Sequence, residues 1–191
     1  KSLGMVRAES LRPIKRSLKM RYLDHAATAF PREAGLDSAM ASGLKTGNPG
    51  RGGHGPAILA SQMLHDARVA VSGLFGLKRS ERCVFHSGAT AGLNDLVQHF
   101  ARAHKGGTVL STDLEHNAVA RPLHEMQRRG LIRWKALPAS GGRFPEALEK
   151  ELRVGPVAAV FVNHISNVSG ERQSLQDIST LCGQHGVALV V

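Results

Sequence analysis

A short run of small and hydroxyl-bearing residues follows a predicted strand and leads into a predicted helix. The run is Ser87-Gly88-Ala89-Thr90. The first turn of a helix presents backbone N–H groups without helical partners, and a threonine hydroxyl adds a donor, so this layout suits a phosphate or another anion. The structural alternative is that Ser87 or Thr90 only caps the helix. The spacing matches neither GxGxxG nor a P-loop.

Two more polar stretches follow predicted strands. His116 opens a helix, where an imidazole can stack on a flat ring or exchange protons near neutral pH. The simpler interpretation is that Asp113 or Asn117 caps this helix and His116 is exposed. Residues 163–170, which include Asn167, follow a Val-rich strand. Because the carboxyl ends of parallel strands meet at one edge of a sheet, we expect the anion donors, the histidine and the amide to face a common ligand.

The loop at residues 47–55 is too rich in glycine to be a helix or a strand. It is either a flexible connector or a binding loop in which Arg51 and His54 reach an anionic group. Ten histidines invite a metal interpretation, but no pair fits HExxH, so no metal site is expected. Cys83 lies in a predicted strand, where a small buried apolar residue is favoured over a nucleophile.

The elements that must position these residues alternate between short apolar runs and helical patterns, which predicts an α/β domain with a mostly parallel sheet flanked by helices. Helices are predicted at residues 32–45, 56–74, 90–103, 117–129, 145–152 and 175–185. Strands are predicted at residues 82–85, 108–111, 131–137, 157–163 and 187–191. The 56–74 helix carries an apolar face for burial, formed by Leu59, Met63, Ala67, Ala70 and Leu74. The last predicted strand has no helix after it, so we expect a domain that is truncated at its C-terminal end.

The net charge of +10 is concentrated at the start of the chain, because residues 1–21 hold seven basic residues against one acidic residue. We treat residues 1–20 as a basic tail and residues 21–191 as the domain. The tail suits a solvated leader, an organellar transit peptide, a membrane-surface segment or a nucleic-acid arm. Nucleic acid is not favoured, because Tyr22 is the only aromatic residue near the tail. No apolar run is long enough to span a bilayer, and two distant cysteines indicate a reducing, cytoplasmic compartment.

Five ordered motifs resemble the N-terminal half of class V aminotransferases, most closely the cysteine desulfurase family. They are Tyr22-Leu23-Asp24-His25-Ala26-Ala27-Thr28, the loop from Asn48 to His54, Ser87-Gly88-Ala89-Thr90, Glu115-His116-Asn117 and Ser166-Asn167-Val168-Ser169-Gly170. The resemblance covers residues 21–191 and implies the large domain of a fold-type I pyridoxal-phosphate enzyme.

The resemblance also implies a role for individual residues. Ala89 and Thr90 would hold the phosphate of pyridoxal 5′-phosphate, and His116 would stack on its ring as the catalytic histidine. Asn167 would lie beside the cofactor and the substrate carboxylate. The residues that would shape the substrate pocket are Ala26, Ala27, Asn48, Arg51, His54 and Asn167, with Arg51 serving across a dimer interface.

Two departures from the family pattern stand out. Ala91 replaces a common acidic residue, and the lysine that binds the cofactor, the aspartate that pairs with its ring nitrogen and the sulfur-accepting cysteine would all lie beyond Val191.

The implied activity of the whole protein is conversion of L-cysteine to L-alanine, with the sulfur left on the enzyme as a persulfide. The implied setting is a homodimer that passes sulfur to an acceptor protein for iron–sulfur cluster assembly. A selenocysteine lyase or another class V aminotransferase would share every motif. These 191 residues alone are expected to be inactive. The alternatives that are not enzymes are a truncated interaction protein and a basic nucleic-acid binder.

Overall fold

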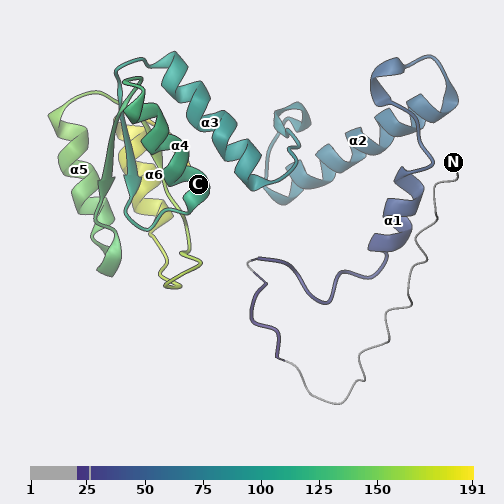
Figure 1. The fold of residues 1–191 in the computed structure, drawn as a ribbon, viewed down its shortest axis with the longest axis horizontal. Coiled ribbons are helices and arrows are strands. Elements are labelled where there is room, and N and C mark those ends of the chain that lie inside the picture. Colours follow the sequence, from purple (N-terminus) through teal and green to yellow (C-terminus); the bar gives the residue numbers. More distant parts are fainter. Residues whose placement is uncertain (1–20, 26) are drawn as a thin grey trace, which may run out of the picture. The chain divides into compact units, whose positions relative to one another are not determined.

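The computed structural model describes residues 21–25 and 27–191 (Figure 1). The predicted basic tail at 1–20 and Ala26 lie outside the described residues. The chain divides into two units, one ending at Thr46 and one beginning at Gly47. No helix in the described part is long and apolar enough to cross a membrane.

The first unit contains one helix, α1 (Leu36–Gly43), which is shorter than the predicted helix at 32–45 and buries none of its residues. Before it, the tyrosine motif folds on itself. The Tyr22 hydroxyl donates a hydrogen bond to the Thr28 carbonyl at 2.6 Å, and its ring packs edge-on against His25 with centroids 4.9 Å apart. The motif therefore makes its own local structure.

The second unit contains a four-stranded parallel sheet. Its strands are β1 (Thr108–Thr112), β2 (Arg133–Leu137), β3 (Val157–Phe161) and β4 (Ala188–Val190), and their order is β2-β1-β3-β4. Each neighbouring pair is parallel. Four of the five predicted strands are confirmed, with ends that differ by one or two residues.

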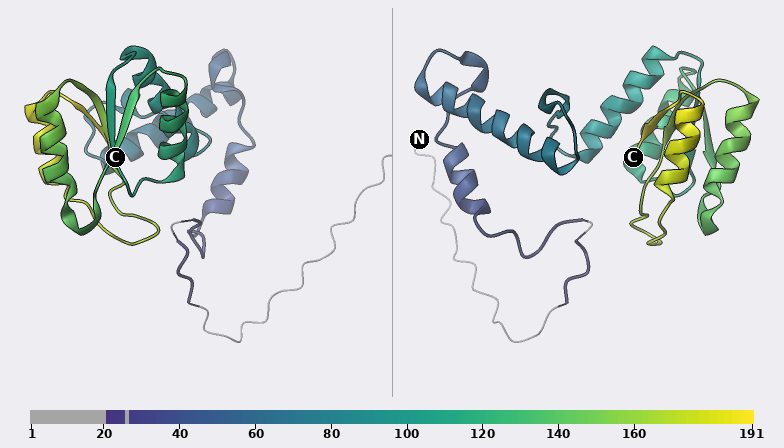
Figure 2. Two further views of the ribbon diagram at one scale, coloured as in Figure 1. Left: turned by 60° about the vertical axis from the view of Figure 1, so that its left-hand side comes forward. Right: turned by 180° about the vertical axis from the view of Figure 1, so that it is seen from behind.

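Helices cover both faces of the sheet, as Figures 1 and 2 show. Side chains of successive strand residues point to opposite faces, so neighbours such as Val109 and Leu110 enter different cores. The core under α3 (Ala89–Ala103) and α4 (Asn117–Arg128) contains Val97, Ala101, Val109, Val119, Leu123, Met126, Ile132, Ala159 and Phe161. The core under α5 (Phe144–Val154) and α6 (Leu175–Gln184) contains Leu110, Leu137, Ala139, Phe144, Leu148, Leu152, Val160, Val162, Ile178 and Cys182. The predicted α/β architecture is confirmed.

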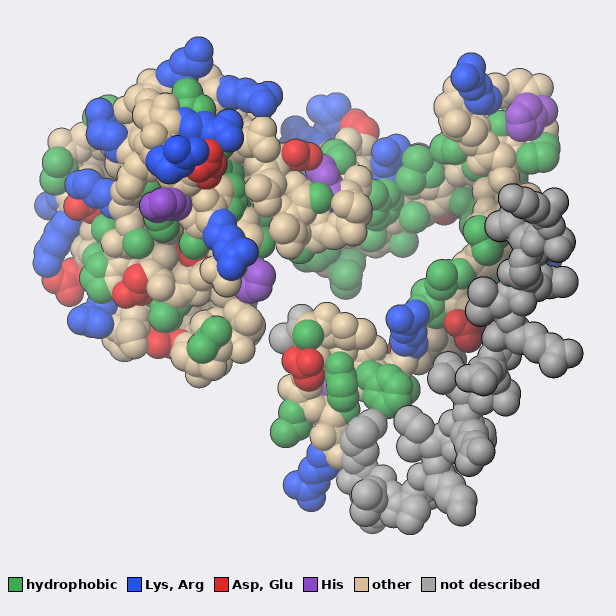
Figure 3. All heavy atoms as spheres, in the orientation of Figure 1, with side chains coloured by type: hydrophobic (Ala, Val, Ile, Leu, Met, Phe, Trp, Pro, Cys, Tyr) green, Lys and Arg blue, Asp and Glu red, His purple; other side chains and the backbone are tan. Residues whose placement is uncertain are grey.

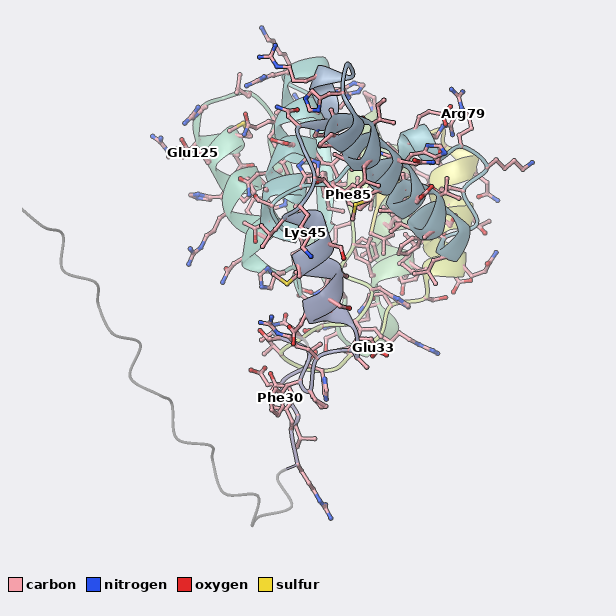
Figure 4. All side chains as sticks on the ribbon, turned by 90° about the vertical axis from the view of Figure 1, so that its right-hand side faces the viewer. Phe30, Glu33, Lys45, Arg79, Phe85 and Glu125 are labelled. Carbon is pink, nitrogen blue, oxygen red and sulfur yellow. The ribbon has the colours of Figure 1, made fainter. Side chains whose placement is uncertain are left out.

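The predicted strand at residues 82–85 is wrong. Ser80–Arg82 forms a short 3₁₀ turn, η2, and the extended residues after it pair with no strand in the described chain. Val84 and Phe85 are 66% and 47% exposed, and Figure 4 labels Phe85. A strand exists only where a neighbour satisfies its N–H and C=O groups, so an apolar run alone does not make one.

The helix predicted at 56–74 is confirmed as α2 (Gly55–Leu74), but its predicted buried face is not. Leu59 and Leu74 are 49% and 80% exposed, whereas the buried residues are Ala57, Ala60 and Ser72. The short turns η1 (Pro49–Arg51) and η2 pack against this helix. Figure 3 shows the apolar side chains along the exposed side of α2.

Gly107, in the turn between α3 and β1, leaves no room for a side chain. A Cβ atom there would lie 2.8 Å from the His104 carbonyl oxygen. We expect Gly107→Ala to lower the free energy of unfolding by about 1–3 kcal/mol, because the turn must shift to relieve this contact. Gly183→Ala is the control, since nothing lies within 4 Å of its added Cβ. Equal urea midpoints for the two variants would contradict this prediction.

Candidate functional site

The N-terminus of α3 offers unpaired donors at the position predicted for an anion. Gly88 precedes the helix, and no side chain caps it, so the capping alternative for Ser87 or Thr90 is not observed. The N–H groups of Ala89 and Thr90 lie in the first turn, where no helical carbonyl is available to them. Both residues are exposed. The positive end of the helix dipole adds to the attraction for an anion.

His116 is itself the N-cap of α4, whereas the simpler interpretation of the sequence placed Asp113 or Asn117 there. Its Nδ1 atom accepts a hydrogen bond from the Ala118 N–H at 3.1 Å. A neutral imidazole that accepts at Nδ1 carries its proton on Nε2. The bond therefore fixes both the orientation and the tautomer of the ring, which is exposed.

Thr90 and His116 line one cleft between α3 and α4, with a volume of about 610 Å³. The other residues that line it are Asn94, Gln98, Asn117, Ala118, Arg121, Pro122, Glu125, Met126 and Arg129. A cleft of this size holds a small organic molecule. The structure thus brings together the predicted anion donor and the predicted ring-stacking histidine.

The α4 side of this cleft keeps a net positive charge, because Arg121 and Arg129 both line it and Glu125 is the one carboxylate among the described residues of its lining. Glu125, which Figure 4 shows on the outer side of α4, pairs with Arg128 at 2.8 Å and with Arg129 at 2.7 Å. Hydrogen bonds from Arg128 and then Arg129 lower the pKa of Glu125 to about 2. Arg121 forms no ion pair with a described residue, and the single Glu125 carboxylate offsets only one of its two arginine partners, so the cleft attracts an anion.

Asn167 lies at the tip of a tight turn after β3 and is exposed. The Ser166 hydroxyl oxygen accepts hydrogen bonds from the N–H groups of Val168 and Ser169. The two sides of the turn meet in a bridge between Ile165 and Arg172. The turn is therefore held by its own residues, and Asn167 is presented to solvent at the carboxyl end of the sheet.

The other predicted substrate residues make local contacts. The Asn48 Oδ1 atom accepts from the Gly50 N–H at 2.8 Å, and the His54 Nδ1 atom accepts from the Ala57 N–H at 3.3 Å as the N-cap of α2. Arg51 and Ala27 are exposed. Ala26 is not described. Within the described chain, the cleft lining includes Thr90 and His116 but not the predicted substrate residues Ala27, Asn48, Arg51, His54 and Asn167.

No role was predicted from the sequence for Glu115, which directly precedes His116. Its Oε1 atom accepts hydrogen bonds from the Thr112 hydroxyl at 2.6 Å and from the Asn163 N–H at 2.7 Å. Burial raises the pKa of Glu115, although both bonds oppose the shift. The folded state therefore favours the protonated form of Glu115. The stabilisation from this group is fully present at a pH below its ordinary pKa and is lost as the pH rises through the raised value. The only signal in the sequence was its place beside His116.

A family model for class V aminotransferases matches residues 21–191. The chain belongs to the class V aminotransferase family. Among curated relatives, a probable cysteine desulfurase from Vibrio cholerae is 26% identical over 196 residues, which cover 100% of this chain and 48% of that protein. The cysteine desulfurase IscS of Dictyoglomus turgidum is 28% identical over 171 residues, covering 87% of this chain and 42% of IscS. The chain spans about half the length of the curated relatives it matches.

Solved structures share the fold. A structure named SspA in complex with cysteine matches with a TM-score of 0.74 at 22% identity, covering 83% of this chain and 46% of that one. A NifS-like protein matches with a TM-score of 0.70 at 24% identity, covering 81% and 44%. The predicted fold class, the large domain of a fold-type I pyridoxal-phosphate transferase, is confirmed.

The cleft of this class V aminotransferase chain suits the chemistry of pyridoxal 5′-phosphate. The free N–H groups and the Thr90 hydroxyl are donors for a phosphate, and the exposed His116 ring is a flat surface for a pyridine. No lysine lines the cleft in the described part of the chain. Lys135 pairs with Glu151 and Lys150 with Glu146, both at 2.7 Å, on the β2 and α5 side.

Neither cysteine of this class V aminotransferase chain lines the cleft. Cys182 is 2% exposed in the core, and burial raises the pKa of its thiol, which keeps the thiol protonated. Cys83 is partly exposed, directly after η2. No cluster of three metal-ligating side chains occurs among residues 21–25 and 27–191.

Proposed function

We propose that this chain supplies the phosphate and ring-stacking half of a cysteine desulfurase that uses pyridoxal 5′-phosphate. The observation that carries the proposal is that Thr90 and His116 line one cleft in a chain of the class V aminotransferase family. The relatives named cysteine desulfurase point to L-cysteine as the substrate. The products are L-alanine and an enzyme-bound persulfide, whose sulfur passes to an acceptor protein.

In that reaction, the residues of this chain bind the cofactor and the substrate and orient them. Ala89 and Thr90 donate to the phosphate, and the α3 dipole supports its charge. His116 presents its ring face to the cofactor, with the Nε2 proton placed by the bond to Ala118. Pyridoxal 5′-phosphate supplies an electron-poor ring that accepts the charge left when a bond to the substrate α-carbon breaks. Asn167 would bind the substrate carboxylate.

The remaining assignments complete the pocket. Ala26 and Ala27 and the loop from Asn48 to His54 would shape the substrate side, and Arg51 would reach across a homodimer interface. Arg51 suits this role because it is exposed and because its guanidinium can hold a carboxylate through two parallel hydrogen bonds.

The test is the mass of the protein isolated from its native source after borohydride treatment, which makes the bond between a lysine and pyridoxal permanent. We expect a mass near twice 20.4 kDa with one pyridoxyl adduct, because the chain covers 48% of a curated relative. We also expect L-cysteine and a thiol reductant to yield L-alanine and sulfide. An unmodified 20.4 kDa species would overturn the proposal. Amino transfer to a keto acid without sulfide would identify an aminotransferase instead.

The Thr90 hydroxyl has its own test. We expect Thr90→Val to weaken binding of pyridoxamine 5′-phosphate about tenfold, because a hydrogen bond to a charged phosphate is lost. This probe carries the phosphate and the ring but needs no lysine. Thr90→Ser keeps the hydroxyl and is the control, and its affinity for the probe is expected to be close to that of the wild-type protein. Equal affinities of Thr90→Val and Thr90→Ser for the probe, measured by fluorescence titration, would show that the hydroxyl does not bind the phosphate.

A further inference from the structure

We propose that Glu115 is a positioning residue, which ties the loop that carries His116 to the end of β3 that carries the Asn167 turn. Its consequence for cofactor binding rests on the proposed function, but the contacts themselves do not.

The carboxylate joins parts of the chain that are far apart in sequence. Thr112 is the last residue of β1 and is 1% exposed, and its hydroxyl donates to Glu115 Oε1 at 2.6 Å. Asn163 lies two residues after β3, and its backbone N–H donates to the same oxygen at 2.7 Å. One oxygen atom therefore fixes the separation of two neighbouring strand ends.

Two other carboxylates at this edge make comparable bonds but join different loops. Asp113 Oδ1 accepts from the Ala139 N–H at 3.0 Å, which ties the β1 loop to the segment after β2. Glu171 accepts from the Gly141 N–H at 2.5 Å and from the Ser140 hydroxyl at 3.1 Å, which ties the Asn167 turn to the short turn η3 (Ser140–Gly142). The three carboxylates therefore link the segments that follow β1, β2 and β3 into a closed ring at the carboxyl edge of the sheet.

Within this ring, Glu115 is the member that bears on both proposed cofactor residues. It directly precedes His116, whose Nδ1 atom accepts the N-cap hydrogen bond from the Ala118 N–H. On the other side, the Asn163 backbone leads into the Ser166–Gly170 turn. Loss of the carboxylate removes a hydrogen bond that joins these two segments, whereas loss of Asp113 removes one only on the side facing β2.

The role requires an acceptor oxygen. A glutamine carbonyl oxygen has two lone pairs and accepts the same two bonds, without the cost of keeping a charge partly buried. Alanine removes the acceptor and leaves the Thr112 hydroxyl and the Asn163 N–H without partners. Rescue by glutamine therefore separates this role from a general need for a negative charge.

The experiment is NMR of the purified protein without cofactor, with the variants Glu115→Ala, Glu115→Gln and Asp113→Ala. We expect Glu115→Ala to raise hydrogen exchange of the Asn163 amide about tenfold and to shift the His116 ring signals away from the tautomer with its proton on Nε2. Glu115→Gln is expected to restore both signals. Asp113→Ala is expected to speed exchange at Ala139 and to leave Asn163 and His116 unchanged.

Unchanged Asn163 and His116 signals in Glu115→Ala would overturn the inference, and so would the same response in Asp113→Ala. If Glu115→Ala does not fold, Thr112→Val removes one donor while keeping the shape of the side chain, and the His116 shift is then measured there. Pyridoxamine 5′-phosphate is added as a separate arm, with weaker binding in Glu115→Ala and recovery in Glu115→Gln. If the unmodified protein binds none of this probe, the proposed function fails while the NMR result still decides the role of Glu115.

Discussion

Replacement of Phe144 by alanine is expected to lower the free energy of unfolding by about 3–5 kcal/mol. Phe144 opens α5, has no exposed surface and packs in the core that holds Leu110, Leu148 and Ile178. Removal of the ring loses its burial and leaves a cavity between the sheet and two helices, which the close-packed surroundings refill only in part. Urea denaturation followed by circular dichroism measures the change.

The matched control for this prediction is Phe75→Ala. Phe75 follows α2 and is 71% exposed, so its removal is expected to change stability by less than about 0.5 kcal/mol. If both variants unfolded at the same urea concentration, Phe144 would not be part of the core described above.

Replacement of His116 by alanine is expected to weaken binding of pyridoxamine 5′-phosphate about tenfold and to reduce turnover of the native enzyme more strongly. The ring face is lost, and so is the imidazole whose proton is placed by the Ala118 bond. His116→Phe keeps a flat ring but has no ring nitrogen. It is therefore expected to retain most of the binding while turnover stays low.

His185→Ala is the control for His116, because His185 is exposed at the end of α6 and does not line the cleft. Loss of the N-cap bond also lowers the free energy of unfolding of His116→Ala by about 1 kcal/mol. Melting curves of all variants are therefore measured together with binding, to show that each variant is folded. Unchanged cofactor content and turnover in His116→Ala would exclude this residue from the site.

The sequence predicted most of the fold because local patterns carry it. The Val-rich run at 157–161 gave β3, and helical spacing gave α4 and α6 with errors of a residue at their ends. Residues 82–85 show the limit. Their composition favours a strand, but strand formation depends on a neighbour, and none pairs with them in the described chain. The apolar face of α2 was misjudged for the same reason, since burial depends on what packs against a helix.

The candidate site, like the fold, could be predicted from the sequence only in part. The position of Thr90 at a strand-to-helix turn and of His116 after β1 could be predicted from strand ends. The capping role of His116 could not, because histidine is not among the residues that usually cap helices. The bonds of Glu115 could not be predicted either, since Glu115 and Asn163 are 48 residues apart in the chain.

The strand order β2-β1-β3-β4 makes the boundary between β1 and β3 a topological switch point. The chain leaves β1 through α4 on one face of the sheet and leaves β3 through α6 on the other, so the two loops diverge. The oxygen of Glu115 that bonds to Asn163 spans this divide. The strand connectivity therefore sets where the loops that carry His116 and Asn167 diverge, and substitutions in α5 or β4 can alter stability while that place stays the same.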